Sequence, residues 1–115
     1  MDLPLRVERG RVAFNRGGYF EAHELWEEVW HELAGAERIF VQGLIQIAAG
    51  LHHLEQQRPR PATGLLRKGL EKISRGAPAP LAHLRAPALA RAVARLLAEL
   101  GAAGVPVPDP TALRL

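Results

Sequence analysis

One histidine and two glutamates are the side chains of this sequence best placed to do chemistry. His23, Glu24 and Glu27 read H-E-x-x-E within the segment F-N-R-G-G-Y-F-E-A-H-E-L-W-E-E-V-W of residues 14–30. Residues four apart share one face of a helix, so His23 and Glu27 could ligate the same metal ion. The carboxylates and the imidazole could also transfer protons. His23, Glu24 and Glu27 are therefore candidate catalytic residues, and His23 and Glu27 are candidate metal ligands.

Polar residues also interrupt the apolar stretch that follows. Gln42, Gln46 and His53 lie at offsets 0, 4 and 11. A buried polar group without a hydrogen-bond partner costs roughly 1–3 kcal/mol, so these groups need partners. A turn at residues 34–36 would bring them level with the first set of candidates. We expect a polar pocket between the two helices, lined by Tyr19, Glu21, Gln42, Gln46 and His53.

The same residues allow a structural interpretation. His23 could do no more than hydrogen-bond Glu27, and the two glutamines could only bridge helices. His53 lies near the end of a helix, where an imidazole interacts favourably with the helix dipole. These groups would then form a buried His/Glu/Gln network that fixes the helix register. The remaining aromatic and histidine residues divide between core and surface, with Phe20, Trp26 and Trp30 expected in the core and His31 and His83 on the surface.

Missing residue types exclude several kinds of site. The chain has no cysteine, which excludes disulfides and thiolate metal centres. Ser74 is its only serine, and it lies in a basic segment, so a serine nucleophile with a dedicated base is not expected. No glycine-rich phosphate loop is present. Any catalysis would use carboxylates and histidine, either alone or with a divalent metal such as Mn, Fe or Zn.

The hydrophobic pattern predicts the elements that position these residues. Apolar residues from Ala22 to Leu33 recur at offsets 0, 3, 4, 7, 8 and 11, which is typical of an amphipathic helix. A short turn makes two successive helices antiparallel neighbours. We predict an all-α fold: a single-domain multihelical bundle of five helices over 1–115, with a central antiparallel pair at about 18–33 and 37–57. The other helices are expected at about 4–14, 61–75 and 86–103, before a Pro-rich tail at about 105–115.

Charge is divided unevenly along the chain. Residues 18–37 contain six glutamates and no Lys or Arg, whereas residues 58–95 contain nine basic residues and one acid, Glu71. The basic half could bind anions or nucleic acid, but no aromatic residues alternate with its cations for base stacking, so nucleic acid is not the expected partner. The wide apolar stripes allow a homo-oligomer.

Location and origin rest on weaker signals. No apolar run reaches the roughly 18 residues of a membrane span, and the first residues lack the apolar region of a signal peptide. We expect a soluble cytoplasmic protein without a membrane partner. Arg outnumbers Lys and cysteine is absent, a composition that resembles that of thermophiles.

Residues 10–55 resemble a known family. The pattern F-N-x-G-x-Y-F-E-A-H-E is matched by Phe14, Asn15, Gly17, Tyr19, Phe20, Glu21, Ala22, His23 and Glu24. Gly43–Gln46 (G-L-I-Q) and the pair His53-Leu54 are also similar to domain-of-unknown-function family 309. The resemblance implies a small bacterial all-helical protein of unestablished function, in a family sometimes labelled as predicted metal-dependent hydrolases. Gly18 departs from the pattern, because many members have a polar residue there.

Three functions are compatible with these observations. The first is a non-catalytic interaction module or self-associating helical module, in which the polar residues form a buried network. The second is a metal-dependent hydrolase-like enzyme that uses His23 and the glutamates, with a small-molecule substrate that the sequence does not identify. The third is anion or nucleic-acid binding through the basic C-terminal half.

Overall fold

Helix α3 (Gly35–Glu55) lies in the middle of the molecule because its apolar residues cover most of its circumference. The structure is a computed structural model that describes residues 2–101 and 104–115. The other elements are α1 (Leu3–Asn15), α2 (Tyr19–Trp30), α4 (Pro59–Ile73), the short 3-10 helix η1 (Ala79–Leu81) and α5 (Ala86–Leu100). No strand occurs in the part of the chain that the structure describes. The predicted all-α fold is confirmed.

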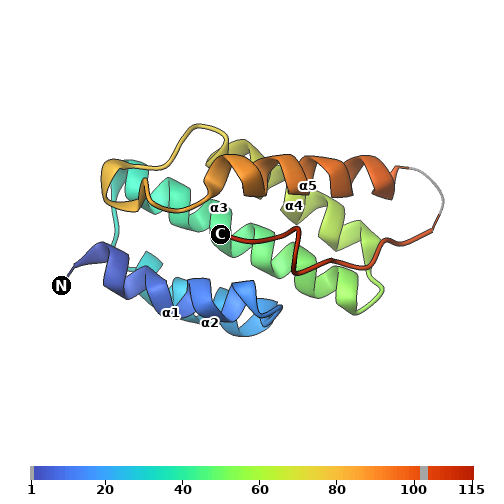
Figure 1. Cartoon of the computed structure of the whole chain (residues 1–115), viewed down its shortest axis with the longest axis horizontal. Helices are drawn as coiled ribbons and strands as arrows, with labels where there is room; N and C mark the ends of the chain where they lie inside the picture. Colours follow the sequence, from blue (N-terminus) through green and yellow to red (C-terminus); the bar gives the residue numbers. More distant parts are fainter. Residues whose placement is uncertain (1, 102–103) are drawn as a thin grey trace.

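Each helix packs against its neighbours in the sequence. Helix α2 contacts α1 and α3, and α4 contacts α3 and α5. The chain reverses direction between α2 and α3 (Figure 1). The helices form one body of 44 × 24 × 23 Å. Helices α1 and α2 therefore lie on one side of α3, whereas α4 and α5 lie on the other (Figure 1).

A tight turn joins α1 to α2 and uses the glycine of the family pattern. Gly17 has a φ of +83°, a conformation that glycine adopts without steric cost. The Gly17 N–H donates to Phe14 O at 2.9 Å, and the Gly18 N–H donates to Ala13 O at 2.8 Å. These two bonds define a Schellman motif, which satisfies the last carbonyls of α1. Part of the pattern that looked functional therefore ends one helix and begins the next.

The aromatic residues of the same pattern form the core between α1 and α2. Phe14 contacts Tyr19 and Trp26, with ring centroids 5.2 and 5.6 Å apart. Trp26 is fully buried, and its indole N–H donates to Val7 O at 3.0 Å. The prediction that Phe20 is in the core is wrong, because its side chain is 52% exposed. Phe20 lies two residues before the buried Ala22, which places it on nearly the opposite side of the helix.

Helices α3 and α4 approach closely at a glycine. A Cβ atom on Gly69 would lie 2.7 Å from Gly43 O and 2.6 Å from Ile47 Cγ1. Real side chains do not occupy such positions, so the close contact of the two backbones requires glycine. The N-terminal and C-terminal halves of the molecule are joined at this contact.

Some helix ends differ from the sequence prediction. Helix α2 ends at Trp30 and α3 begins at Gly35, so the turn lies before the predicted residues 34–36. Helix α4 begins at Pro59, which occupies a first-turn position where a missing N–H is harmless. The predicted end of the last helix at 103 lies outside the described residues. None of the described helices combines the length and the apolarity that a membrane crossing would need.

The last residues return along the molecule toward α1 (Figure 1). Leu113 and Leu115 are both buried. The Leu115 N–H donates to Asn15 Oδ1 at 2.8 Å. Asn15 of the family pattern therefore holds the tail against the end of α1.

Candidate functional site

His23 and Glu27 contact each other on the surface of α2. His23 Nε2 lies 3.3 Å from Glu27 Oε2, and the two side chains are 27% and 45% exposed. One helical turn separates the residues, so the helix itself brings them together. Glu24 is exposed nearby on the same helix.

Phe20 lies between two imidazole rings. Its ring centroid is 6.0 Å from that of His23, with the planes inclined at 22°, and 5.1 Å from that of His52 on α3. The second contact joins α2 to α3 near the start of α2 and the end of α3. An exposed phenyl ring supported by two imidazoles forms an apolar projection at the edge between α2 and α3.

A half-buried strip runs along α3 between α2 and α4. Its residues, at positions 42, 45, 46, 49, 52 and 53, share one face of the helix. None of them is fully buried or fully exposed. His52 at one end contacts Phe20 of α2, and Gln46 in the middle accepts a hydrogen bond of 2.9 Å from Lys72 Nζ of α4. The strip contains no Asp, Glu, Lys or Arg. We call it the α3 strip, and it consists of Gln42, Ile45, Gln46, Ala49, His52 and His53.

The α3 strip is flanked by opposite charges. Glu24 and Glu27 follow Phe20 and His23 by one turn on the α2 side, whereas Lys68 precedes Lys72 by one turn on the α4 side. The face is therefore acidic along one edge, neutral in the middle and basic along the other edge.

Two predicted pocket residues lie elsewhere. Tyr19 is 1% exposed and belongs to the core below the surface. Burial, with the charges of Glu55 and Asp109, raises the pKa of its hydroxyl, so the phenol stays protonated. Glu21 is exposed and lines a cavity between α1 and α2 together with Arg16. The structure links His23 of α2 to His52 and His53 of α3 through Phe20, whereas Gln46 bonds Lys72 of α4. It does not bring Tyr19 and Glu21 to this surface.

Three buried polar atoms near this face have no hydrogen-bond partner among residues 2–101 and 104–115. They are the Tyr19 hydroxyl, His23 Nδ1 and His53 Nδ1. Burial lowers the pKa of His53, and the nearby Arg58 and His52 lower it further. His53 is therefore more easily kept neutral than an imidazole in water.

The described residues do not assemble a complete metal centre. Protein zinc sites use three or four ligands, and the described part of the chain has no group of three or more His, Cys, Asp or Glu residues arranged to hold an ion. His23 and Glu27 offer two ligands, and they contact each other. The arrangement can exchange a proton between imidazole and carboxylate, and it can present an aromatic ring to a partner.

The sequence interpretation did not include several residues of this face. Phe20 was expected in the core, and His52 and Ile45 of α3 and Lys72 of α4 were not among the candidate site residues. A signal was available for the strip, because Ile45, Ala49 and His52 recur at offsets 0, 4 and 7. The expected positions of His31 and His83 are correct, since both are exposed.

Comparison with known proteins gives a family but no activity. The model of the family described as "Domain of unknown function (DUF309)" matches residues 7–65. An "Uncharacterized protein" of Aquifex aeolicus (strain VF5) is 29% identical over 65 residues, which is 56% of this chain and 20% of that protein. The matched part therefore spans about a fifth of the length of this relative. Both matches are to proteins whose printed names assign no function.

Proposed function

We propose, from the premise that the chain belongs to the DUF309 family, that it is a non-catalytic helical module that self-associates through the α3 strip. The single observation that carries the proposal is the exposed Phe20 at the edge of this strip, 52% exposed and held between His23 and His52. Exposed aromatic residues next to a neutral, half-buried face are typical anchors of protein interfaces.

The charge distribution favours a second copy of the chain as the partner. A twofold axis parallel to α3 would place the α3 strips of two copies face to face. The acidic edge of one copy would then lie over the basic edge of the other, twice in each dimer. Glu24 and Glu27 would meet Lys68 and Lys72, and such complementarity steers association and fixes its register.

Measurement of mass in solution tests this proposal. Sedimentation of the wild type over a range of concentrations should show a monomer–dimer equilibrium. Phe20→Ser should weaken association by about ten-fold or more, because a few aromatic anchors dominate interface energy. Leu5→Ser is the matched control, since Leu5 is 68% exposed on α1, away from the strip. A wild type that stays monomeric, or equal behaviour of the two variants, would contradict the proposal.

Metal-dependent hydrolysis is the second candidate. It is favoured by the buried Nδ1 atoms of His23 and His53, which lack partners among the described residues. Elemental analysis of chelator-rinsed protein, after exposure to Mn, Fe and Zn, tests this candidate. Near-stoichiometric metal that is lost in His23→Ala and kept in His31→Ala would support it. A wild type without metal would remove it.

A further inference from the structure

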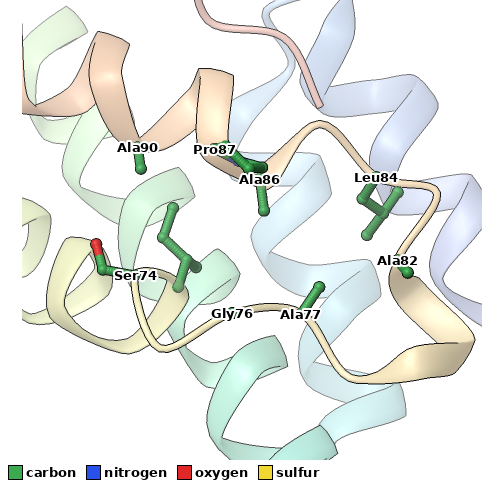
Figure 2. A pocket seen from close by; sticks show the side chains of 9 residues that line it. Ser74, Gly76, Ala77, Ala82, Leu84, Ala86, Pro87 and Ala90 are labelled. Atoms are coloured by element: carbon green, nitrogen blue, oxygen red, sulfur yellow. The ribbon is translucent and has the colours of Figure 1, made fainter.

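A cavity of about 380 Å³ lies between the end of α4, the loop at residues 76–77 and the start of α5. Figure 2 shows Ala77, Leu84 and Ala86 directed toward the same space. Most of the lining side chains are too small to fill it, and Ser74 carries the only side-chain oxygen among them. The volume falls within the range of roughly 300–1,000 Å³ that is usual for small-ligand pockets.

Positive charge surrounds this cavity. Arg75, Arg85 and Arg91 are exposed, and each is the neighbour in sequence of a lining residue. No Asp or Glu occurs between Lys72 and Ala98. Arg75 is engaged by Glu71 through a hydrogen bond of 3.0 Å, which leaves Arg85 and Arg91 as the stronger local charges. The segment that lines the cavity is therefore basic, which favours an anion.

The start of α5 adds donors at the same place. Ala86 and Pro87 line the cavity and form the first turn of this 15-residue helix. Pro87 has no N–H, and the Leu89 N–H donates to Arg85 O at 3.0 Å. No side chain of the described residues caps this turn, so the N–H groups of Ala86 and Ala88 are the ones that an acceptor could reach. The positive end of the helix dipole further favours an anion.

We propose that this cavity binds a small carboxylate with a compact apolar body. The apolar body would fill the space between Ile73, Leu84 and Ala77. The carboxylate would lie at the mouth, against the first turn of α5 and the Arg85 guanidinium. This binding site lies on α4 and α5, on the side of α3 away from α2 (Figure 1).

Titration with octanoate, followed by amide NMR of the full chain, tests the proposal. Shifts should concentrate at residues 73–90. Octanol has a similar apolar body without the charge, and it should bind roughly ten-fold more weakly because it lacks charge-assisted hydrogen bonds. Shifts spread over the whole surface, no binding of octanoate, or equal binding of octanol would overturn the proposal.

Two pairs of variants locate the ligand. Ala90→Leu should fill the cavity and weaken octanoate binding by at least about ten-fold, while Ala94→Leu, exposed on the same helix, should leave it unchanged. Arg85→Gln should weaken binding by roughly five-fold, whereas Arg67→Gln, exposed on α4, should have little effect. Unchanged affinity in Ala90→Leu, in a variant whose NMR spectrum remains folded, would overturn the assignment of the cavity.

Discussion

The two sides of α3 differ in how their space is filled. On the α1–α2 side, large aromatic residues such as Trp26 and Phe14 are fully buried and contact each other. On the α4–α5 side, alanines and a glycine line a cavity of about 380 Å³. The first side contains the family pattern and the second does not. The α1–α2 side also has surface cavities, of about 580 and 320 Å³, but Arg and Glu side chains are among their linings. The two sides therefore differ in the chemistry of their cavities, and an inconspicuous alanine-rich region offers the more apolar space for a ligand.

The charges differ in the same way. The α2 side contributes the glutamates that border the α3 strip, and the α4 side contributes the lysines. Ion pairs such as Arg6–Glu32 and Arg75–Glu71 neutralise part of the charge on each side. Glu24 on the α2 side and Lys68 on the α4 side are exposed, so each side can still attract an external partner of the opposite sign. The proposed dimer uses both edges together, whereas the proposed carboxylate site uses only the basic side.

Truncation of one core residue on each side of α3 should give the largest difference in stability. Trp26→Ala should lower the free energy of unfolding by about 3–5 kcal/mol, because it removes a large buried side chain and its hydrogen bond to Val7. Leu84→Ala should cost about 2 kcal/mol, at the low end for leucine, because Leu84 already faces a cavity. Urea denaturation measures both values. Equal losses would contradict the comparison.

The close contact between α3 and α4 at Gly69 should be nearly as sensitive to substitution. Gly69→Ala should cost about 1–3 kcal/mol, because the new methyl group would meet the backbone of α3 at Gly43. Gly64→Ala on the same helix is the control. A Cβ at Gly64 would meet no atom of the described residues within 4 Å, so this change should stabilise by about 0.5–1 kcal/mol. The sign of the two changes in thermal midpoint checks the close approach.

The free energy of unfolding should depend on pH because of His53, a residue of the α3 strip. The pKa of His53 is lowered in the folded state, so the unfolded state binds more protons near the ordinary histidine pKa of about 6.5. Stability should therefore fall as the pH decreases from about 7.5 to 5. Burial raises the pKa of nearby Glu55, which acts in the opposite direction. The free energy of unfolding, measured across this pH range for the wild type and for His53→Gln, isolates the contribution of His53. Identical pH profiles of the two proteins would contradict this contribution.

The smallest expected effect concerns the end of α3. Gln57 has a φ of +59°, which costs a residue with a side chain about 1 kcal/mol relative to glycine. Gln57→Gly should therefore stabilise by about 0.5 kcal/mol after the added freedom of the unfolded chain is included. Gln56→Gly should destabilise instead, since Gln56 has a φ of −88°. Chemical denaturation of the pair measures the difference.

The helices could be predicted from sequence because their apolar residues follow a clear period. The stripe through Ala22 and Trp26 correctly predicted α2, and the nearly continuous apolar run correctly predicted that α3 is central. The turn between them was placed too late because Gly35, although it has a φ of +61°, is the first residue of α3. A glycine between alanines indicates a break in a helix, but it does not indicate on which side the break occurs.

The candidate site was harder to predict because it depends on contacts between helices. The spacing of His23 and Glu27 is a property of a single helix, and their contact followed from it. Gln46 could turn toward α2 or α4, and only the position of Lys72 decides between them. Phe20 was misplaced because its identity suggested burial although its helical position did not. Side-chain type alone is a weaker guide to exposure than position around the helix.

Mixing two charge-reversed variants tests the proposed dimer most directly. Glu24→Lys/Glu27→Lys and Lys68→Glu/Lys72→Glu should each be monomeric when alone, because like charges would then meet across the twofold axis. An equimolar mixture should dimerise again in sedimentation, since each variant supplies the edge that the other lacks. A mixture that remains monomeric, from variants with unchanged helical circular dichroism, would contradict self-association through the α3 strip.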